Sequence, residues 1–169
     1  MASNFRLVDT GWNHELHDAI HADHSAVRIV CPFIKLHTVE QLLRKRKPGL
    51  LQVITRFNGE DFVGGVSDIA ALRFLMQRGA DIRCIKHLHA KLYLFGNSRS
   101  IVTSANLTTA ALQKNQEFGF VAEDPAVIAG CRQYFDQLWK QSGTDLTADR
   151  LDAMEKRVTA ALLSRPSQA

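Results

Sequence analysis

Residues 26–33 read AVRIVCPF, a short apolar stretch that is rich in β-branched residues and typical of a buried strand. Two similar stretches follow it, LLQVIT at Leu50–Thr55 and DIRCI at 81–85. Helical patterns separate them at 38–47 and 68–78, because apolar residues recur there at about every third or fourth position. Strands that alternate with helices in this way predict a parallel sheet with helices on its faces.

The segments outside this stretch complete the predicted fold. A helix is expected at 12–24 before it. After it, short strands and helices are expected at 91–95, 100–103, 107–112, 116–122, 125–141 and about 147–163. We therefore predict an α/β fold with a mixed, mostly parallel sheet sandwiched by helices and a C-terminal helical appendage. Residues 1–145 form the main domain in this prediction, and residues 146–169 add a helix and tail to the same domain.

Composition excludes several classes of protein. The chain has 169 residues, of which 46% are hydrophobic and 22% charged, and this balance is typical of a globular domain rather than a disordered chain. Its apolar runs are too short to span a bilayer, and its N-terminus lacks the apolar region of a signal peptide. The three cysteines include no CxxC pair, which argues against a disulfide framework or zinc ribbon. We expect a cytoplasmic protein with no membrane partner, and its net charge of +4 permits a polyanionic one.

A set of polar residues follows the ends of three predicted strands. Its members are His89, Lys91, Ser104, Asn106 and Glu117. The ammonium, hydroxyl and carboxamide groups are suited to a phosphate, and the imidazole can act as nucleophile or general acid if a partner such as the carboxylate fixes its tautomer. A single carboxylate argues against a two-metal site. The set predicts a phosphate-ester site that uses no metal and no cofactor.

The same residues resemble a known family. His89-Ala90-Lys91, Ser104-Ala105-Asn106 and Asn115-Gln116-Glu117 look like the phospholipase D superfamily motif HxK…GSxN…E. More narrowly, residues 26–122 resemble the short, single-motif bacterial endonucleases and the nuclease domains of metal-independent restriction enzymes. Two positions depart from the motif: Gly96 stands where the family has Asp, and Thr103 where it has Gly.

The resemblance implies a reaction and an assembly. One histidine attacks phosphorus to form a phosphohistidine, and a second histidine, from another copy of the motif, protonates the leaving oxygen. This chain contains one HxK, so the resemblance implies a homodimer whose active site is shared between two chains. Each chain would supply the five residues named above. The expected activity is metal-independent hydrolysis of DNA or RNA, with residues 1–145 as the catalytic domain.

Other basic residues are candidates for substrate binding. They are Arg56 and His87 on predicted loops, and Arg44, Lys45, Arg46 and Lys47 at the end of a predicted helix. For His87 and the basic run, a solvated surface is the simpler interpretation. His14, His17, His21 and His24 lie on one helical stripe, which we interpret as a polar helix face because a straight stripe cannot surround a metal ion with four ligands.

Two alternative functions stay open. A lipid phosphodiesterase or transphosphatidylase should carry an exposed apolar loop near the site, and the only candidate is Phe62-Val63. A nucleic-acid-binding module without turnover would not need both His89 and Glu117. No separate sequence-reading domain fits in the chain, so sequence specificity would require a partner protein.

Overall fold

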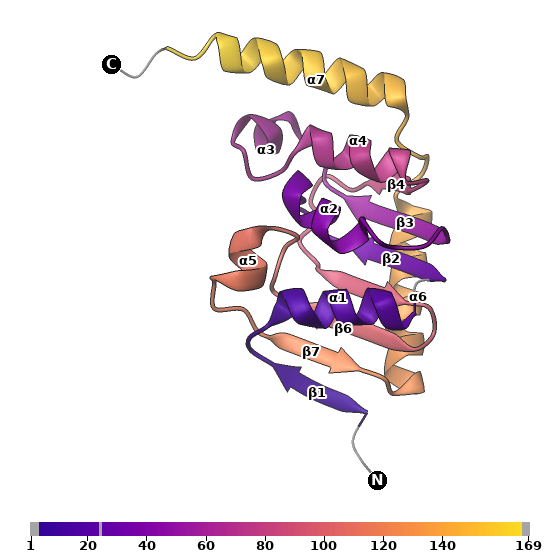
Figure 1. Ribbon diagram of the computed structural model, residues 1–169. Helices are drawn as coiled ribbons and strands as arrows, with labels where there is room; N and C mark the ends of the chain where they lie inside the picture. Colours follow the sequence, from indigo (N-terminus) through magenta and orange to yellow (C-terminus); the bar gives the residue numbers. More distant parts are fainter. Residues whose placement is uncertain (1–3, 24, 167–169) are drawn as a thin grey trace.

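The computed structural model describes residues 4–23 and 25–166, which form a seven-stranded sheet with helices on both faces (Figure 1). The strands are β1 (Phe5–Val8), β2 (Ala26–Val30), β3 (Leu50–Thr55), β4 (Asp81–Cys84), β5 (Leu92–Phe95), β6 (Arg99–Thr103) and β7 (Gly119–Ala122). Their order across the sheet is β1-β7-β6-β5-β2-β3-β4. The predicted α/β fold with a mixed sheet is confirmed.

The prediction of a mostly parallel sheet is wrong. Only β2–β3 and β3–β4 are parallel, and the other four pairings are antiparallel. The reason lies in the connections: β4 reaches β5 through a loop without a helix, β5 reaches β6 through a tight hairpin, and β7 starts at the edge where β6 ends. Two strands joined at the same end run antiparallel. Two strands run parallel only when the connection, usually a helix, returns the chain to the end where the first strand began.

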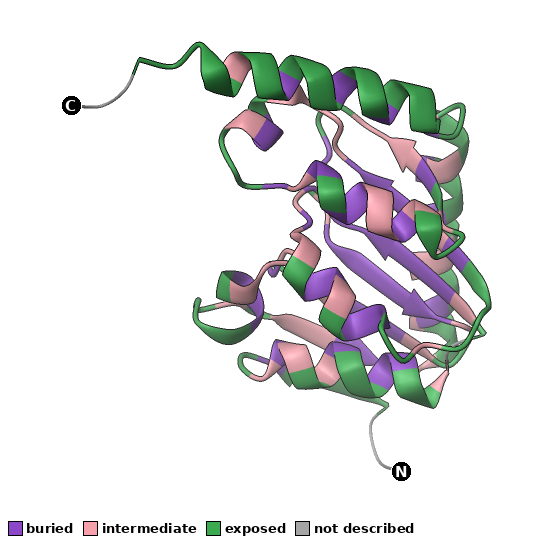
Figure 2. Cartoon of the chain, turned by 45° about the horizontal axis from the view of Figure 1, so that its top comes forward, coloured by how far each residue is buried: buried purple, intermediate pink, exposed green. Residues whose placement is uncertain are grey.

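Helices form a layer on each side of the sheet. They are α1 (Trp12–Ala22), α2 (Leu36–Leu43), α3 (Gly59–Val63), α4 (Ile69–Gln77), α5 (Thr109–Gln113), α6 (Pro125–Gln141) and α7 (Ala148–Leu163). Helices α1, α2 and α4 cover one face of the sheet, and α6 crosses the other face (Figure 1). The central strands between the layers are buried over most of their length (Figure 2). The short α3 lies in the segment that we expected to be a loop.

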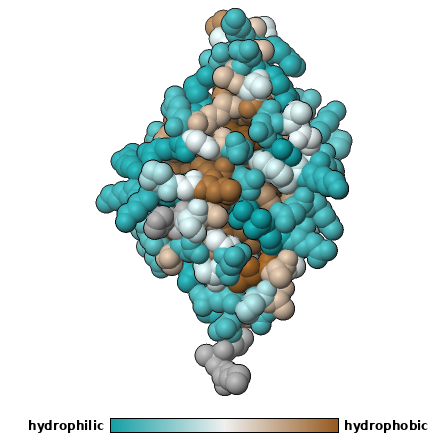
Figure 3. Space-filling model, turned by 90° about the vertical axis from the view of Figure 1, so that its right-hand side faces the viewer, coloured by the Kyte–Doolittle hydropathy of each residue, from teal (hydrophilic) through white to brown (hydrophobic). Residues whose placement is uncertain are grey.

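The face covered by α6 has its own hydrophobic cluster. Phe135 and Leu138 of α6 pack on Leu92 and Leu94 of β5, while the alternate residue Tyr93 points to the opposite core. Seen from the right-hand side of Figure 1, hydrophobic side chains gather in the middle of the surface among hydrophilic ones (Figure 3).

The C-terminal helix packs on the chain beside β4. Helix α7 lies across α3 and α4 (Figure 1). Its buried residues Leu151, Met154 and Val158 belong to the hydrophobic core between the sheet and helices α1, α2 and α4. Arg73 of α4 forms an ion pair with Asp152 at 2.9 Å. Within the described residues, no helix combines the length and apolarity that crossing a membrane requires.

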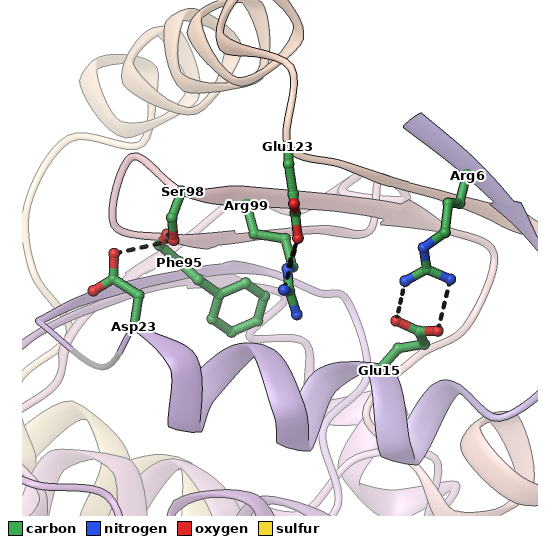
Figure 4. Close-up of polar contacts among 7 residues, drawn as sticks. All are labelled: Arg6, Glu15, Asp23, Phe95, Ser98, Arg99 and Glu123. Atoms are coloured by element: carbon green, nitrogen blue, oxygen red, sulfur yellow. Dashed lines mark hydrogen bonds and ion pairs between the residues drawn. The ribbon is translucent and has the colours of Figure 1, made fainter. Parts of the chain in front are cut away.

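The first strand was not predicted from the sequence. Its four residues have no strong strand pattern, and pairing with β7 is what makes them a strand. Arg6 of this strand donates two hydrogen bonds to Glu15 of α1, at 3.1 and 2.8 Å (Figure 4). A second ion pair, between Arg99 and Glu123 at 2.7 Å, joins β6 to the segment after β7 (Figure 4).

Candidate active site

The predicted site residues meet at one edge of the sheet. Strands β2, β3 and β6 end at this edge, and β5 and β7 begin there. His89 and Lys91 precede β5, Ser104 and Asn106 follow β6, and Glu117 precedes β7. Because the antiparallel strands alternate in direction, residues before one strand and after the next lie side by side.

His89 and Lys91 form the first half of the site. The Lys91 Nζ lies 3.4 Å from Nδ1 of His89. The imidazole is exposed, whereas the lysine side chain is largely buried beneath it, with the residue 9% exposed. The ammonium is therefore held by its surroundings beside the ring, where an anion bound at the imidazole would contact both groups.

Ser104 and Glu117 form the second half. The Ser104 hydroxyl donates a short hydrogen bond to Oε2 of Glu117 and accepts one from the Phe118 N–H at 3.1 Å. Asn115 donates to the other carboxylate oxygen at 3.4 Å. The expected bond between a His89 ring nitrogen and Glu117 is not found among the described residues. Within one chain, the carboxylate orients the serine instead.

Asn106 is held by residues that the sequence analysis did not single out. The Cys31 thiol, directly after β2, has two acceptors within reach of its single proton, the Phe33 carbonyl at 3.2 Å and Oδ1 of Asn106 at 3.7 Å. Its sulfur accepts the Leu107 N–H at 3.3 Å. Tyr93 donates to the carbonyl of Ala105 at 3.0 Å. Burial raises the pKa of the Cys31 thiol, so it stays protonated and able to donate. These supports lie within apolar strand patterns, which carry no signal of a polar role.

Thr103 occupies the position where the motif has glycine. Its hydroxyl accepts the Ala105 N–H at 3.1 Å and so helps to shape the turn that carries Ser104. The residue opposite Thr103 in the sheet is Gly119, and a Cβ on that glycine would collide with Thr103 and the Val102 carbonyl. The close approach of the two strands therefore requires glycine at 119.

The other predicted substrate contacts divide between two regions. Arg56 lies at the candidate edge, but its guanidinium forms an ion pair with Asp61, with Nε and Oδ2 2.9 Å apart, and packs over the Phe33 ring. His87 is exposed on the loop before β5, at the same edge.

The basic run 44–47 lies elsewhere. It follows α2 and leads into β3, whose far end is at the candidate edge. Arg46 donates to the Leu50 carbonyl at 2.7 Å, and Arg78 donates to the carbonyls of Leu43 and Arg44 at 3.2 and 3.4 Å. The structure therefore does not bring Arg44, Lys45, Arg46 or Lys47 to the predicted catalytic residues.

The histidine stripe lies on α1. His14, His17 and His21 line a surface hollow of about 450 Å³ between α1, α2 and α5. His24 is outside the described residues. The part of the chain that the structure describes contains no cluster of three or more His, Cys, Asp or Glu residues placed to hold a metal ion.

Comparison with known proteins assigns the family. Residues 16–139 match the family described as cardiolipin synthase, PLD-like domain. The chain belongs to this PLD-like domain family. The match includes β2 to β7 and all five predicted site residues. The resemblance to the phospholipase D superfamily is thus confirmed. No curated protein matches this PLD-like domain.

Solved structures share the fold. The phospholipase D family member Nuc from Salmonella typhimurium is 20% identical, with a TM-score of 0.69 over 85% of this chain and 98% of Nuc. NucT from Helicobacter pylori is 15% identical, with a TM-score of 0.63 over 84% and 98% of the two chains. TrmBL2, an archaeal chromatin protein with a novel mode of DNA binding, is 11% identical, with a TM-score of 0.57 over 83% and 54%. At these identities the likeness establishes the fold of the PLD-like domain.

Proposed function

We propose that this PLD-like domain is a metal-independent phosphodiesterase that hydrolyses nucleic acid. The observation that carries the proposal is the arrangement at the sheet edge: Lys91 Nζ lies 3.4 Å from the His89 ring, and the Ser104–Glu117 pair is carried by the neighbouring strand ends. This arrangement combines a nucleophile with cationic and neutral donors for phosphoryl oxygens.

In the proposed reaction, a ring nitrogen of His89 attacks phosphorus, and the bond from phosphorus to the leaving oxygen breaks. The imidazolium of His89 in a second chain donates its proton to that oxygen. The same imidazole then accepts a proton from water, which attacks the phosphohistidine and breaks the phosphorus–nitrogen bond. Lys91 and Asn106 stabilise the phosphoryl oxygens in both steps.

One chain supplies only half of this set. The surface beside His89 supports a second chain as the source of the other half. A hollow of about 620 Å³ is lined by His89, Lys91 and Ser104 together with the apolar Val102, Val127 and Tyr134. Val102 pairs with Phe120, which pairs in turn with Leu7 on the edge strand, so one face carries all three.

The apolar surface continues outward from this hollow. Leu7 and Phe118 are 67% and 60% exposed, and Phe5 stacks on Phe120 with ring centroids 4.8 Å apart. We call Phe5, Leu7, Phe118, Phe120 and Tyr134 the apolar strip. A large apolar surface directly beside an incomplete catalytic set fits a second copy of the chain, because a two-fold interface there brings the two His89 side chains together.

Charge at the same edge supports nucleic acid as the substrate. Lys86 and Lys114 are exposed on loops that flank the site residues, and such cations suit a phosphate backbone. DNA binding by TrmBL2, which shares the fold, also supports this choice. Phe62, in α3, is buried, so the segment expected to expose apolar side chains in a lipid enzyme does not do so. The apolar strip, which is exposed beside the site, is assigned here to contact with a second chain.

The test is hydrolysis in EDTA of plasmid DNA, RNA and phosphatidylcholine by the full chain. We expect cleavage of nucleic acid and no release of choline. His89→Ala should lose activity by at least about a thousandfold, since it removes the nucleophile and the general acid together. His17→Ala, on the exposed face of α1, is the matched control and should retain activity.

Different outcomes would refute different parts of the proposal. Activity that disappears in EDTA and returns with a divalent cation would contradict the metal-independent reaction. Choline release without nucleic-acid cleavage would show that the substrate is a lipid and not a nucleic acid. Full activity of His89→Ala would remove the assigned nucleophile.

A further inference from the structure

Two histidines on α1 direct the same ring nitrogen at each other. The Nε2 atoms of His17 and His21 are 3.0 Å apart, and the rings meet edge to face with centroids 4.2 Å apart. Both residues are exposed on successive turns of the helix. The two Nε2 atoms are therefore close enough for one metal ion to contact both.

We propose that His17 and His21 chelate a divalent late transition-metal ion, with Cu²⁺ preferred. An ion about 2.0 Å from each nitrogen would form an angle of about 97° with the two nitrogens, given their separation of 3.0 Å. That angle fits neighbouring positions of a square-planar or tetragonal ion, which is the geometry of Cu²⁺ and Ni²⁺. A tetrahedral Zn²⁺ site, with an angle of about 109°, would need a separation of about 3.3 Å, which a small rotation of these exposed side chains supplies, so the preference for Cu²⁺ comes from its stronger binding to imidazole nitrogen.

Neighbouring groups define the rest of the site. The Asp18 carboxylate is 3.9 Å from Nδ1 of His17, the ring nitrogen that the ion would not occupy, and its charge lies near enough to favour a cation at the ring. The adjoining hollow offers oxygen atoms from Thr38, Gln41 and Gln113. Its lining contains no carboxylate and includes Arg44 and Lys45. Water or a small anion is therefore the expected occupant of the ion's other positions.

The same distance also fits a hydrogen bond between two neutral imidazoles, in which one Nε2 donates to the other. Metal binding would replace that shared proton with the ion. The two interpretations differ in what happens when metal is added. The site is separate from the proposed phosphodiesterase residues, so its test does not depend on that activity.

The experiment titrates CuCl₂, NiCl₂ and ZnCl₂ into the full chain carrying His89→Ala, so that the candidate catalytic imidazole does not contribute. Binding is followed by calorimetry, and the Cu²⁺ complex by electron paramagnetic resonance. We expect Cu²⁺ to bind most tightly, with a spectrum typical of two equatorial imidazole nitrogens. His21→Ala should weaken Cu²⁺ binding by at least about tenfold, because the second ligand of a chelate binds at high effective concentration.

His14→Ala is the matched control, since it removes an imidazole from the same hollow without removing either chelating nitrogen. We expect it to bind Cu²⁺ as the parent does. Unchanged binding in both His17→Ala and His21→Ala would overturn the proposal, as would an equal loss in His14→Ala. Thermal unfolding without metal checks that each variant is folded, and a rise in the midpoint on adding Cu²⁺ only where both histidines remain would support the site.

Discussion

The carboxylate of Asp23 lies where a side chain on Gly96 would lie. Gly96 has a φ of 54°, and a Cβ there would collide with the Asp23 carboxylate. One oxygen of that carboxylate accepts the Ser98 hydroxyl at 3.1 Å (Figure 4). The other oxygen accepts the Ser25 hydroxyl at 2.6 Å. The motif that this chain resembles has Asp at position 96. Here the residue after α1 provides a carboxylate at the same turn.

This relationship predicts that Gly96 tolerates substitution poorly. Gly96→Ala should lower the free energy of unfolding by about 2 kcal/mol, because it combines a positive φ with displacement of the Asp23 side chain, which would lose its hydrogen bonds to Ser25 and Ser98. Gly65→Ala is the matched control: its φ is 76°, but open space surrounds the site, so about 1 kcal/mol is expected. Chemical denaturation measures both. Equal losses would show that the Asp23 contact does not matter.

A second variant tests whether a carboxylate on residue 96 can take the place of the Asp23 carboxylate. Gly96→Asp should be strongly destabilising alone and less so when combined with Asp23→Gly, which vacates the space. The pair should be coupled by about 1 kcal/mol or more in a double-mutant cycle. Additive losses would contradict the idea that the two positions share one space.

The Cys31 thiol is predicted to position Asn106. Cys31→Val should leave the buried Leu107 N–H without its acceptor and cost about 1–3 kcal/mol of stability. If Asn106 contacts the phosphoryl group, kcat should also fall. Cys31→Ser keeps a donor and an acceptor and should retain more of the activity. Equal kcat values for the two variants, measured where both are folded, would argue against a positioning role.

Cys84 should make stability depend on alkaline pH. Burial raises the pKa of this thiol from 9.0 to about 11, with the charge of Arg150 partly opposing the rise. The neutral thiol is favoured in the folded chain, so its contribution is complete below pH 9 and is lost as the pH rises toward 11. The loss should reach about 2 kcal/mol.

Denaturant unfolding of the parent and Cys84→Ala at pH 7.5, 9 and 10.5 measures this contribution. Other groups titrate equally in both proteins, so the difference between the two curves isolates the thiol. We expect the parent to lose more stability with rising pH than the variant. Parallel curves would contradict the prediction.

The apolar strip is predicted to be the dimer interface. Phe118→Asp should shift the chain toward monomer in analytical ultracentrifugation and reduce nuclease activity at least about tenfold at low protein concentration, because a charge would be buried in an apolar contact. Leu163→Asp, which changes an exposed apolar residue at the end of α7, should alter neither property. A monomeric parent with full activity would refute the shared site.

Much of the fold follows from local patterns. The helices at α1, α4 and α6 were predicted to within one or two residues at most ends, because their apolar faces repeat at helical spacing. The direction of β5 relative to β2 and that of β7 relative to β6 were not predicted, since a strand pattern is the same for either direction and only the connection determines which occurs. The edge strand β1 depends on pairing with residues more than a hundred positions away.

The sequence predicted which residues form the candidate site better than it predicted which of them contact one another. His89, Lys91, Ser104, Asn106 and Glu117 do lie at one edge, because strand ends carry them there. The sequence could not show that Ser104 rather than His89 is the partner of Glu117 within one chain. It also could not show that Asp61 engages Arg56. Such pairings depend on side-chain distances across elements.

The sequence by itself therefore determined the types of group available for chemistry and the strand and helix segments that carry them, because both are written in local residue order. Only the tertiary structure decided which groups meet. It placed Lys91 beside His89, Cys31 beside Asn106, His17 opposite His21 and apolar side chains beside the candidate site. Those relationships arise from strand direction and packing, which local sequence does not encode.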